Sequence, residues 1–497
     1  MKKTNRSDQG KISLWLIPLF IFVLLAMVLL FADLWYIRIY GKTNFDSIIF
    51  TLTSNLSGSS STLLWQYILE GLIPAILVGA LLILLSVILL RKKKVRTWMA
   101  TMGLCLVSLG ALAYAAVDSQ LVEYLININN GFNIYEDFYQ DPDDTQITFP
   151  KEKRNLVYIV LESMESTFLS KELGGGVENN LIPELYELAK NNINFSQNEG
   201  VGGFRQTTGA TWTIGSLVAQ TSGVPLVPIV SPNETSEDGT FLPGLTTLAD
   251  ILHDNGYYQA FMLGSSAAFG DTGLLYSAHG VDKVYDVYTA PDDGIVEPGY
   301  WDNWWGMEDY YLFEYAKQEL TKIAAQDQPF AFTMMTIDTH HVGGHTCPYC
   351  EKEYQQQYDN VIACSSRQVA AFISWLQQQP YYENTTVVIV GDHNSMDNGY
   401  FKRNVEDGYI RRVYNCFINS AAHTTASKNR EFTTLDLFPT TLAAMGCTIE
   451  GDRLGLGTNL FSGLPTLLEQ WDYETLCARL YSNKDYYAQQ FRTKTED

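Results

Sequence analysis

The sequence predicts an α/β domain with a mostly parallel central sheet, preceded by three transmembrane helices. The long apolar runs of this 497-residue chain nearly all lie before residue 120, and the remainder is acidic and rich in aromatic residues. In that remainder, short apolar runs alternate with helix-like stretches, as strands and helices do in an α/β sheet. Polar residues directly follow three of the short runs, at the edge where α/β sheets bind ligands.

Three apolar stretches near the N-terminus are long enough to cross a bilayer, whose hydrocarbon core is about 30 Å thick. They run from about Ile12 to Tyr36, from Gly71 to Leu90 and from about Trp98 to Val117. A cleaved signal peptide is the alternative for the first stretch. That stretch is longer than the core of a signal peptide, and two more spans follow it. We therefore expect a multi-pass membrane protein.

Basic residues beside these stretches predict the orientation. They are Lys2, Lys3, Arg6 and Lys11 before the first stretch, and Arg91, Lys92, Lys93, Lys94 and Arg96 between the second and the third. Loops rich in Lys and Arg stay in the cytoplasm, and these clusters outweigh Arg38 and Lys42 in the loop between the first two spans. Residues from about 120 onward are then expected outside the cell membrane. The net charge of −22 argues against a nucleic-acid partner, because binding to phosphate backbones needs clustered cations.

The cysteines are compatible with this location. Cys105 lies in the third apolar stretch, and the outer part holds Cys347, Cys350, Cys364, Cys416, Cys447 and Cys477. An even number of cysteines is compatible with disulfides in an oxidising compartment. The run Cys347-Pro-Tyr-Cys350 resembles a glutaredoxin motif, but it lacks the strand before it and the helix after it. We expect a disulfide within a loop instead.

Four apolar runs are typical of buried strands in a parallel sheet. They are Asn155–Leu161, Tyr258–Leu263, Phe330–Ile337 and Thr386–Val390. Helix-like segments lie between them, at Leu181–Asn191, Leu245–Asn255, Met307–Ala325 and Ser365–Gln378. This order predicts that the carboxyl ends of the strands meet at one edge of the sheet.

The residues that follow three of these runs carry the candidate chemistry. Glu162 follows the first run, Asp338-Thr339-His340-His341 ends the third, and Asp392-His393 follows the fourth. Two carboxylates and an imidazole, from Glu162, Asp392 and His393, suit Mn²⁺, Zn²⁺ or Mg²⁺. A buried polar network without a metal is the alternative.

A threonine near the start of a helix is the candidate nucleophile. The segment from Gly202 to Pro225 has a flexible, polar first half, followed by helix-like residues from Thr213. A helix N-terminus attracts a phosphoryl group through its free N–H groups and its dipole. Thr207, Thr208 and Thr211 compete with Thr213 for this role, and a helix-capping threonine is the alternative to any nucleophile.

Several segments resemble the lipoteichoic acid synthase and phosphoglycerol transferase family, which belongs to the sulfatase branch of the alkaline phosphatase superfamily. They are Val157-Tyr-Ile-Val-Leu-Glu-Ser-Met-Glu-Ser, Thr211-Trp-Thr-Ile-Gly-Ser, Ile337-Asp-Thr-His-His, Gly391-Asp-His and Gly451-Asp-Arg-Leu-Gly-Leu-Gly. The Trp212-Thr-Ile and Gly223-Val-Pro-Leu segments and the position of Cys364 before a helix are more similar to the phosphoglycerol transferases of periplasmic glucans.

The resemblance implies an alkaline-phosphatase- and sulfatase-like fold and a role for each site residue. Thr213 would be the nucleophile and a ligand of one divalent metal ion together with Glu162, Asp392 and His393, and His340 would contact the phosphoglycerol group. Mn²⁺ is the implied metal, with Mg²⁺ and Zn²⁺ as alternatives. Phe269-Gly-Asp-Thr272 replaces a Phe-Trp-Asn-Arg-like motif of the synthases, which puts the substrate contacts of that loop in doubt. The chain also has three expected spans where the synthases usually have five.

The expected organisation has four parts: a membrane anchor at 1–120, a linker at 121–154, a catalytic domain at 155–463 and a C-terminal tail at 464–497. The implied reaction moves phosphoglycerol from phosphatidylglycerol, through a phosphothreonine, to a surface glycan or glycolipid acceptor. His340 is expected to donate a proton to the leaving alkoxide. The alternatives are a phosphoethanolamine transferase and a binding module without activity. A true sulfatase is disfavoured, because no Cys-x-Pro-Ser-Arg-like motif is present.

Overall fold

A computed structural model of the chain describes residues 16–41, 44–53, 61–90, 94–128, 132–228, 240–300, 306–481 and 484–493. Most of the basic residues that predict the orientation, namely Lys2, Lys3, Arg6, Lys11, Lys42, Arg91, Lys92 and Lys93, lie outside these ranges. The chain forms two compact units. The first contains residues 1–43 and 60–123, and the second contains residues 44–59 and 124–497.

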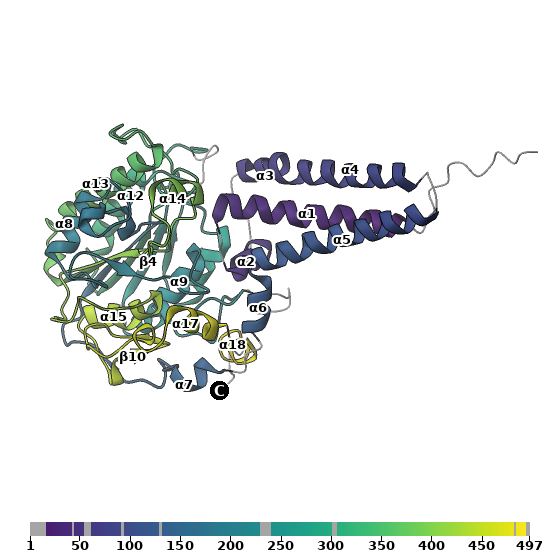
Figure 1. The fold of residues 1–497 in the computed structure, drawn as a ribbon. Helices are drawn as coiled ribbons and strands as arrows, with labels where there is room; N and C mark the ends of the chain where they lie inside the picture. The colour runs from purple at the N-terminus through teal and green to yellow at the C-terminus, as the bar shows by residue number, and fades with distance from the viewer. Residues whose placement is uncertain are drawn as a thin grey trace, which may run out of the picture. The chain divides into compact units, whose positions relative to one another are not determined.

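The first unit is made of long apolar helices. Its elements are α1 (Ile17–Tyr40), α3 (Ser61–Tyr67), a π-helical turn (Ile68–Leu72), α4 (Ile73–Leu90) and α5 (Lys94–Asp118). In the described part of the chain, three stretches are long and apolar enough to cross a membrane: Ile17–Tyr40, Leu64–Ile88 and Trp98–Asp118. Small side chains let these helices pack closely, as where Gly79 meets Leu24 and Met27, and Figure 1 shows α1, α4 and α5 side by side. Leu77 and Leu106 are exposed, as suits contact with lipid.

The second unit is built on a seven-stranded sheet with the order β3-β8-β7-β2-β6-β4-β5. The strands are β2 (Asn155–Leu161), β3 (Gly203–Phe204), β4 (Tyr258–Leu263), β5 (Lys283–Tyr285), β6 (Phe330–Met335), β7 (Thr385–Gly391) and β8 (Val413–Ile418). The five strands from β7 to β5 are parallel, whereas β8 runs antiparallel to β7 and β3 antiparallel to β8. The predicted α/β architecture is confirmed.

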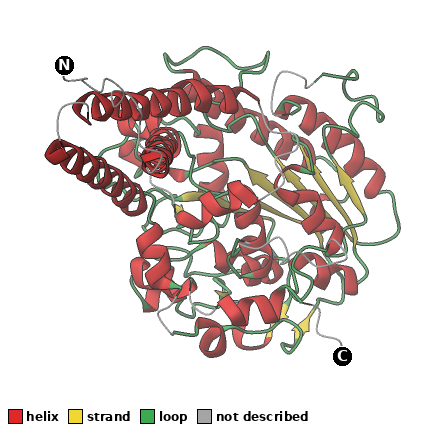
Figure 2. Cartoon of the chain, turned by 90° about the vertical axis from the view of Figure 1, so that its right-hand side faces the viewer, coloured by secondary structure: helices red, strands yellow, loops and turns green. Residues whose placement is uncertain are grey.

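Helices cover both faces of this sheet, as Figure 2 shows for the yellow strands between red helices. Leu156, Tyr158 and Val160 of β2 enter one core, and the alternate residues of β2 enter the other, because successive side chains of a strand point to opposite faces. The first core packs against α9 (Thr213–Ser222), α10 (Leu248–Asp254), α11 (Thr272–Ala278) and α15 (Leu437–Ala444). The second core packs against α8 (Pro183–Asn191), α12 (Asp309–Ile323), α13 (Gln357–Leu376) and α14 (Asn398–Asn404).

The largest boundary difference from the sequence prediction is at α13. This helix begins at Gln357, eight residues before the expected start at Ser365. Cys364 therefore lies inside the helix and not before it. The start of the helix could not be recognised in the sequence, because the polar segment around Gln356 and Gln357 carries no strong capping residue.

Residues 124–154 of the expected linker and the expected tail both belong to the second unit. The linker region contains α6 (Leu121–Asn127), α7 (Ile134–Phe138) and β1 (Ile147–Thr148), and β1 pairs with β9 (Thr448–Ile449). The tail region contains α16 (Leu467–Gln470), α17 (Tyr473–Leu480) and α18 (Lys484–Phe491). Tyr135 of α7 stacks on Tyr486 and contacts Tyr487 and Phe491 of α18. The two regions thus pack against each other through aromatic side chains.

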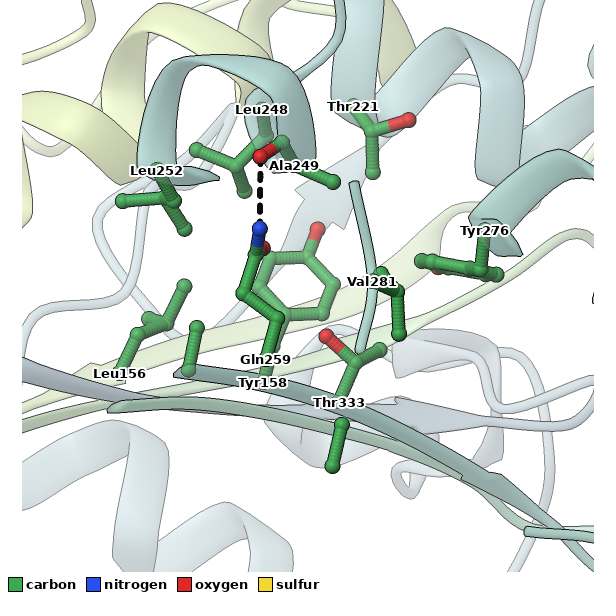
Figure 3. A pocket seen from close by; sticks show the side chains of 12 residues that line it. Leu156, Tyr158, Thr221, Leu248, Ala249, Leu252, Gln259, Tyr276, Val281 and Thr333 are labelled. Atoms are coloured by element: carbon green, nitrogen blue, oxygen red, sulfur yellow. Dashed lines mark hydrogen bonds between the residues drawn. The ribbon is translucent and has the colours of Figure 1, made fainter. Parts of the chain in front are cut away.

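Figure 3 shows a pocket between the sheet and α10, lined by side chains of β2, β4 and β6. The Gln259 amide donates a hydrogen bond of 2.7 Å to the Ala249 carbonyl across it. Leu156 and Ala331 belong to the amino-terminal halves of their strands, so this pocket lies away from the residues that follow the strands.

Candidate metal centre

The three predicted ligands lie together at the carboxyl ends of neighbouring strands. Glu162 follows β2, and Asp392 and His393 follow the adjacent strand β7. One donor atom from each of the three residues lies within 4.8 Å of the other two, and all three side chains are buried. The parallel register brings them to the same edge, because Leu161 pairs with Gly391.

Backbone groups orient the Asp392 carboxylate. The N–H groups of Ser163 and His393 each donate a hydrogen bond of 2.7 Å to its Oδ1. Its Oδ2 is buried and accepts no hydrogen bond from the described residues. Ser163 adopts a positive φ of 53°, a strained conformation for a residue with a side chain, and such conformations cluster at functional sites. One oxygen is therefore fixed while the other is left for another partner.

The His393 ring directs a lone pair toward Asp392 Oδ2 and Thr213 Oγ1. Its Nδ1 donates to the Asn394 carbonyl over 2.9 Å, so the lone pair of the neutral ring is on Nε2. Nε2 lies 3.2 Å from Asp392 Oδ2 and 3.5 Å from Thr213 Oγ1. Two lone pairs that face each other in a buried site repel, and a bound cation would turn this contact into an attraction.

These distances fit one divalent ion. With metal–ligand bonds of about 2.0–2.2 Å, neighbouring ligand atoms are about 3.0–3.6 Å apart in octahedral or tetrahedral coordination. The 3.2 and 3.5 Å separations around His393 Nε2 lie in this range. Glu162, Thr213, Asp392 and His393 would therefore hold the ion through oxygen atoms and one nitrogen.

Burial raises the pKa of Glu162 well above its usual range, and the neighbouring Asp392 charge raises it further. A bound cation would offset both effects, because an opposite charge nearby stabilises an ionised carboxylate. The raised pKa of Glu162 and the ligand distances thus both favour a bound cation.

The geometry also distinguishes Thr213 from the other threonines. Thr213 is half-buried and is the first residue of α9, whereas Thr207, Thr208 and Thr211 are buried. The Thr208 hydroxyl is occupied by a hydrogen bond of 3.1 Å from Asn44. α9 is fastened to the end of β7, because Ser216 and Gln220 donate to the carbonyls of Asp392 and Gly391 over 2.5 and 2.9 Å.

His340 lies outside this group of ligands, in the segment after β6. Its Nδ1 donates to the His341 carbonyl over 2.8 Å, and the two rings stack at 4.5 Å. Burial lowers the pKa of His340 to about 4, and His393 adds to this effect. The low pKa favours the neutral ring, with its lone pair on Nε2, in the site without a cation. The expected role of His340 as proton donor to the leaving alkoxide stays a prediction.

Asp338 also lies outside the group of ligands. Burial raises its pKa, and the nearby Asp309 of α12 adds to the shift. Asp309 accepts a hydrogen bond of 2.7 Å from the Ile337 N–H. A position at the end of a strand therefore does not by itself place a carboxylate in the metal centre, since Asp338 follows a strand and lies outside it.

Sequence reasoning missed the contribution of α2 (Phe45–Thr53), which belongs to the second unit. Asp46 is buried and accepts a hydrogen bond of 2.9 Å from the Gly209 N–H. Phe50 stacks on Trp212, which precedes Thr213, with ring centroids 5.3 Å apart. The signal in the sequence is an acidic residue in an apolar segment too short to cross a membrane.

Known proteins share this framework. The sulfatase family model matches residues 154–447. Phosphoglycerol transferase I of Escherichia fergusonii is 28% identical over 365 residues, which cover 72% of this chain and 46% of that protein. Phosphoglycerol transferase I of Salmonella choleraesuis is 27% identical over 428 residues, which cover 84% of this chain and 53% of that protein. The chain thus spans about half the length of these relatives.

A solved membrane protein has the same fold. Lipooligosaccharide phosphoethanolamine transferase A from Neisseria meningitidis superposes with a TM-score of 0.51 at 14% identity, over 86% of this chain and 84% of that one. The predicted alkaline-phosphatase- and sulfatase-like fold is confirmed. Because the family model covers more than half of its residues, this chain belongs to the sulfatase family.

Proposed function

We propose that this protein is a metal-dependent phosphoglycerol transferase of the cell membrane. It takes phosphoglycerol from phosphatidylglycerol and passes it, through a phosphothreonine on Thr213, to a surface glycan or glycolipid. The names of the relatives described above support the transferred group. The observation that carries the proposal is the position of the Thr213 hydroxyl, 3.5 Å from His393 Nε2 at the start of α9.

This position suits attack on a phosphodiester. The N-terminus of α9 attracts the anionic phosphoryl group through its unpaired N–H groups and its dipole. A bound divalent ion, with Mn²⁺ first and Mg²⁺ or Zn²⁺ as alternatives, would lower the pKa of the Thr213 hydroxyl and polarise the phosphorus. Glu162, Asp392 and His393 would orient that hydroxyl by holding the same ion.

Two displacements then complete the reaction. In the first, the Oγ–P bond to Thr213 forms as the bond from phosphorus to diacylglycerol breaks, and the hydroxyl proton ends on diacylglycerol. In the second, an acceptor oxygen bonds to phosphorus, the Oγ–P bond breaks, and the acceptor's proton ends on Thr213. His340 transfers these protons: it donates to the leaving diacylglycerol alkoxide in the first displacement and takes up the acceptor's proton in the second.

The membrane topology supports an extracytoplasmic site. α2 and residues 124–497 form one compact unit, so both must lie on one side of the membrane. Among the described residues, one candidate span precedes α2 and three precede residue 124, and both counts are odd. The catalytic domain thus remains on the outer side predicted from the basic clusters, where the anchor keeps it close to its lipid donor.

Intact-mass analysis of the full-length protein tests the proposal. The detergent-solubilised protein is incubated with Mn²⁺ and phosphatidylglycerol, and we expect an added phosphoglycerol group that maps to Thr213. Thr213→Ala should lose this adduct, whereas Thr211→Ala, which removes a buried hydroxyl two residues earlier, should keep it. An adduct on another residue, or none from phosphatidylglycerol, would refute the proposal. An adduct from phosphatidylethanolamine alone would establish the phosphoethanolamine transferase alternative.

A further inference from the structure

A second cluster of metal-ligating side chains lies after β6, apart from the candidate metal centre. The Cys347 Sγ is 3.6 Å from the Cys350 Sγ and 3.8 Å from the Cys364 Sγ, and the three sulfur atoms all lie within 4.8 Å of one another. All seven cysteines of the chain are described, and all are free thiols. The expected disulfide within this loop is not formed in the structure.

These sulfur–sulfur distances match those between neighbouring thiolate ligands of one metal ion. With Zn–S bonds of about 2.3 Å, two sulfurs of a tetrahedral site are about 3.8 Å apart. The sulfurs of a disulfide are about 2.0 Å apart and join in pairs. Here one sulfur is close to two others at once, which a metal ion can satisfy and a single disulfide cannot.

The local structure brings the three thiols close to one another. Cys350 N–H donates to the Cys347 carbonyl over 3.0 Å, which closes the tight turn of the Cys347-Pro-Tyr-Cys350 run. Cys364 faces this turn from α13, and Cys347 and Cys364 are buried. Gln368, one turn further along α13, donates from its amide to the Cys364 Sγ over 3.4 Å. A hydrogen bond donated to sulfur favours the thiolate form that binds metal.

We propose that Cys347, Cys350 and Cys364 bind one thiophilic divalent ion, with Zn²⁺ preferred over other metals. This ion is distinct from that of the candidate metal centre. Thiolates select Zn²⁺, whereas the oxygen-rich set of Glu162, Asp392 and Thr213 suits harder ions such as Mn²⁺.

The site has a structural consequence for the candidate active site. Residues 336–356 connect β6 to α13 without a helix or a strand, and a connection of this length is usually functional or disordered. The same segment carries His340. A metal held by two cysteines of the segment and one of α13 would fasten it to the helix and so order the residues around His340.

Cobalt substitution of the full-length protein tests this site separately from the proposed function. Bound to thiolates, Co²⁺ gives a thiolate-to-metal charge-transfer band in the near ultraviolet, which oxygen and nitrogen ligands do not give. We expect the band from the reduced wild-type protein and from Asp392→Asn. Cys347→Ser, Cys350→Ser and Cys364→Ser should each lose it, whereas Cys447→Ser, a buried cysteine elsewhere, should keep it.

A second measurement does not depend on the folding of the variants. The wild-type protein loaded with Zn²⁺ is titrated with a mercurial thiol reagent, and a metal-sensitive dye should detect release of about one equivalent of Zn²⁺ as the thiolates are capped. The inference is overturned if the reduced protein gives no charge-transfer band, if the band survives all three cysteine substitutions, or if thiol capping releases no Zn²⁺.

Discussion

Glu162 and Asp392 show how single residues define this site. Each carboxylate loses its hydration on folding, and no Lys or Arg side chain of the described residues is paired with either of them. The sequence predicted that both residues follow strands, as they do in the structure, because a strand followed by an acidic residue is a local pattern. The consequence, a raised pKa for Glu162, comes first from burial of the side chain and then from the nearby Asp392 charge. Neither burial nor this proximity could be read from one segment alone.

Metal binding should release a proton from Glu162. The pKa of Glu162 is raised in the metal-free site, so the group holds its proton to a higher pH than usual and must lose it to bind a cation. Apparent Mn²⁺ affinity should therefore rise with pH up to that pKa and level off above it. Calorimetric titration with Mn²⁺ at one pH, in two buffers of different ionisation enthalpy, measures the number of protons released.

Glu162→Gln should abolish this proton release and weaken Mn²⁺ binding by on the order of 100-fold. The exposed Glu383→Gln is the matched control and should behave as the wild type. Equal proton release from wild type and Glu162→Gln would show that another group titrates.

Among the secondary-structure elements, α2 and α9 together position Thr213 and the segment before it. α9 carries Thr213 and is fastened to β7 by Ser216 and Gln220. α2 supports the segment just before Thr213, through Asp46 on the Gly209 N–H and Phe50 on Trp212. The sequence predicted α9 from its apolar residues. It did not reveal the role of α2, because more than 150 residues separate the two helices in the chain.

Phe50→Ala should slow formation of the Thr213 adduct while leaving Mn²⁺ binding unchanged. Loss of the stacked ring lets the loop that carries Trp212 shift, and a displacement of about 1 Å can cost roughly 100-fold in rate. Leu52→Ala on the exposed side of the same helix is the control and should react as the wild type, since Leu52 is 80% exposed. Rapid-quench mass analysis of the adduct gives the rate. A wild-type rate in Phe50→Ala would exclude a positioning role for α2.

At the scale of the whole molecule, the segments that flank the catalytic domain close its fold. α7 and α18 bury Tyr135, Tyr487 and Phe491 together. Polar residues and turn signals made the first segment look like a linker, and the second had no clear pattern. Neither can bury its aromatic side chains alone, so their structure exists only through the partner segment.

Phe491→Ala should lower the free energy of unfolding by about 3–5 kcal/mol, because it opens a cavity in this aromatic cluster. Gln489→Ala, on the exposed side of α18, should change it by less than about 0.5 kcal/mol. Denaturant unfolding followed by tryptophan fluorescence measures both. Equal stability of the two variants would mean that α18 does not contribute to the core of the second unit.

Three features could be predicted from the sequence alone: the apolar spans, the strand–helix alternation and the strand ends that bear Glu162, Asp392 and His393. These features follow from local periodicity and from the rule that parallel strands end at one edge of a sheet. Folding was needed to show that Thr213 faces His393, that burial lowers the pKa of His340, and that Cys364 meets Cys347 and Cys350. All three depend on long-range packing. Distances and burial between residues far apart in the chain depend on how whole elements pack, and no local pattern encodes that packing.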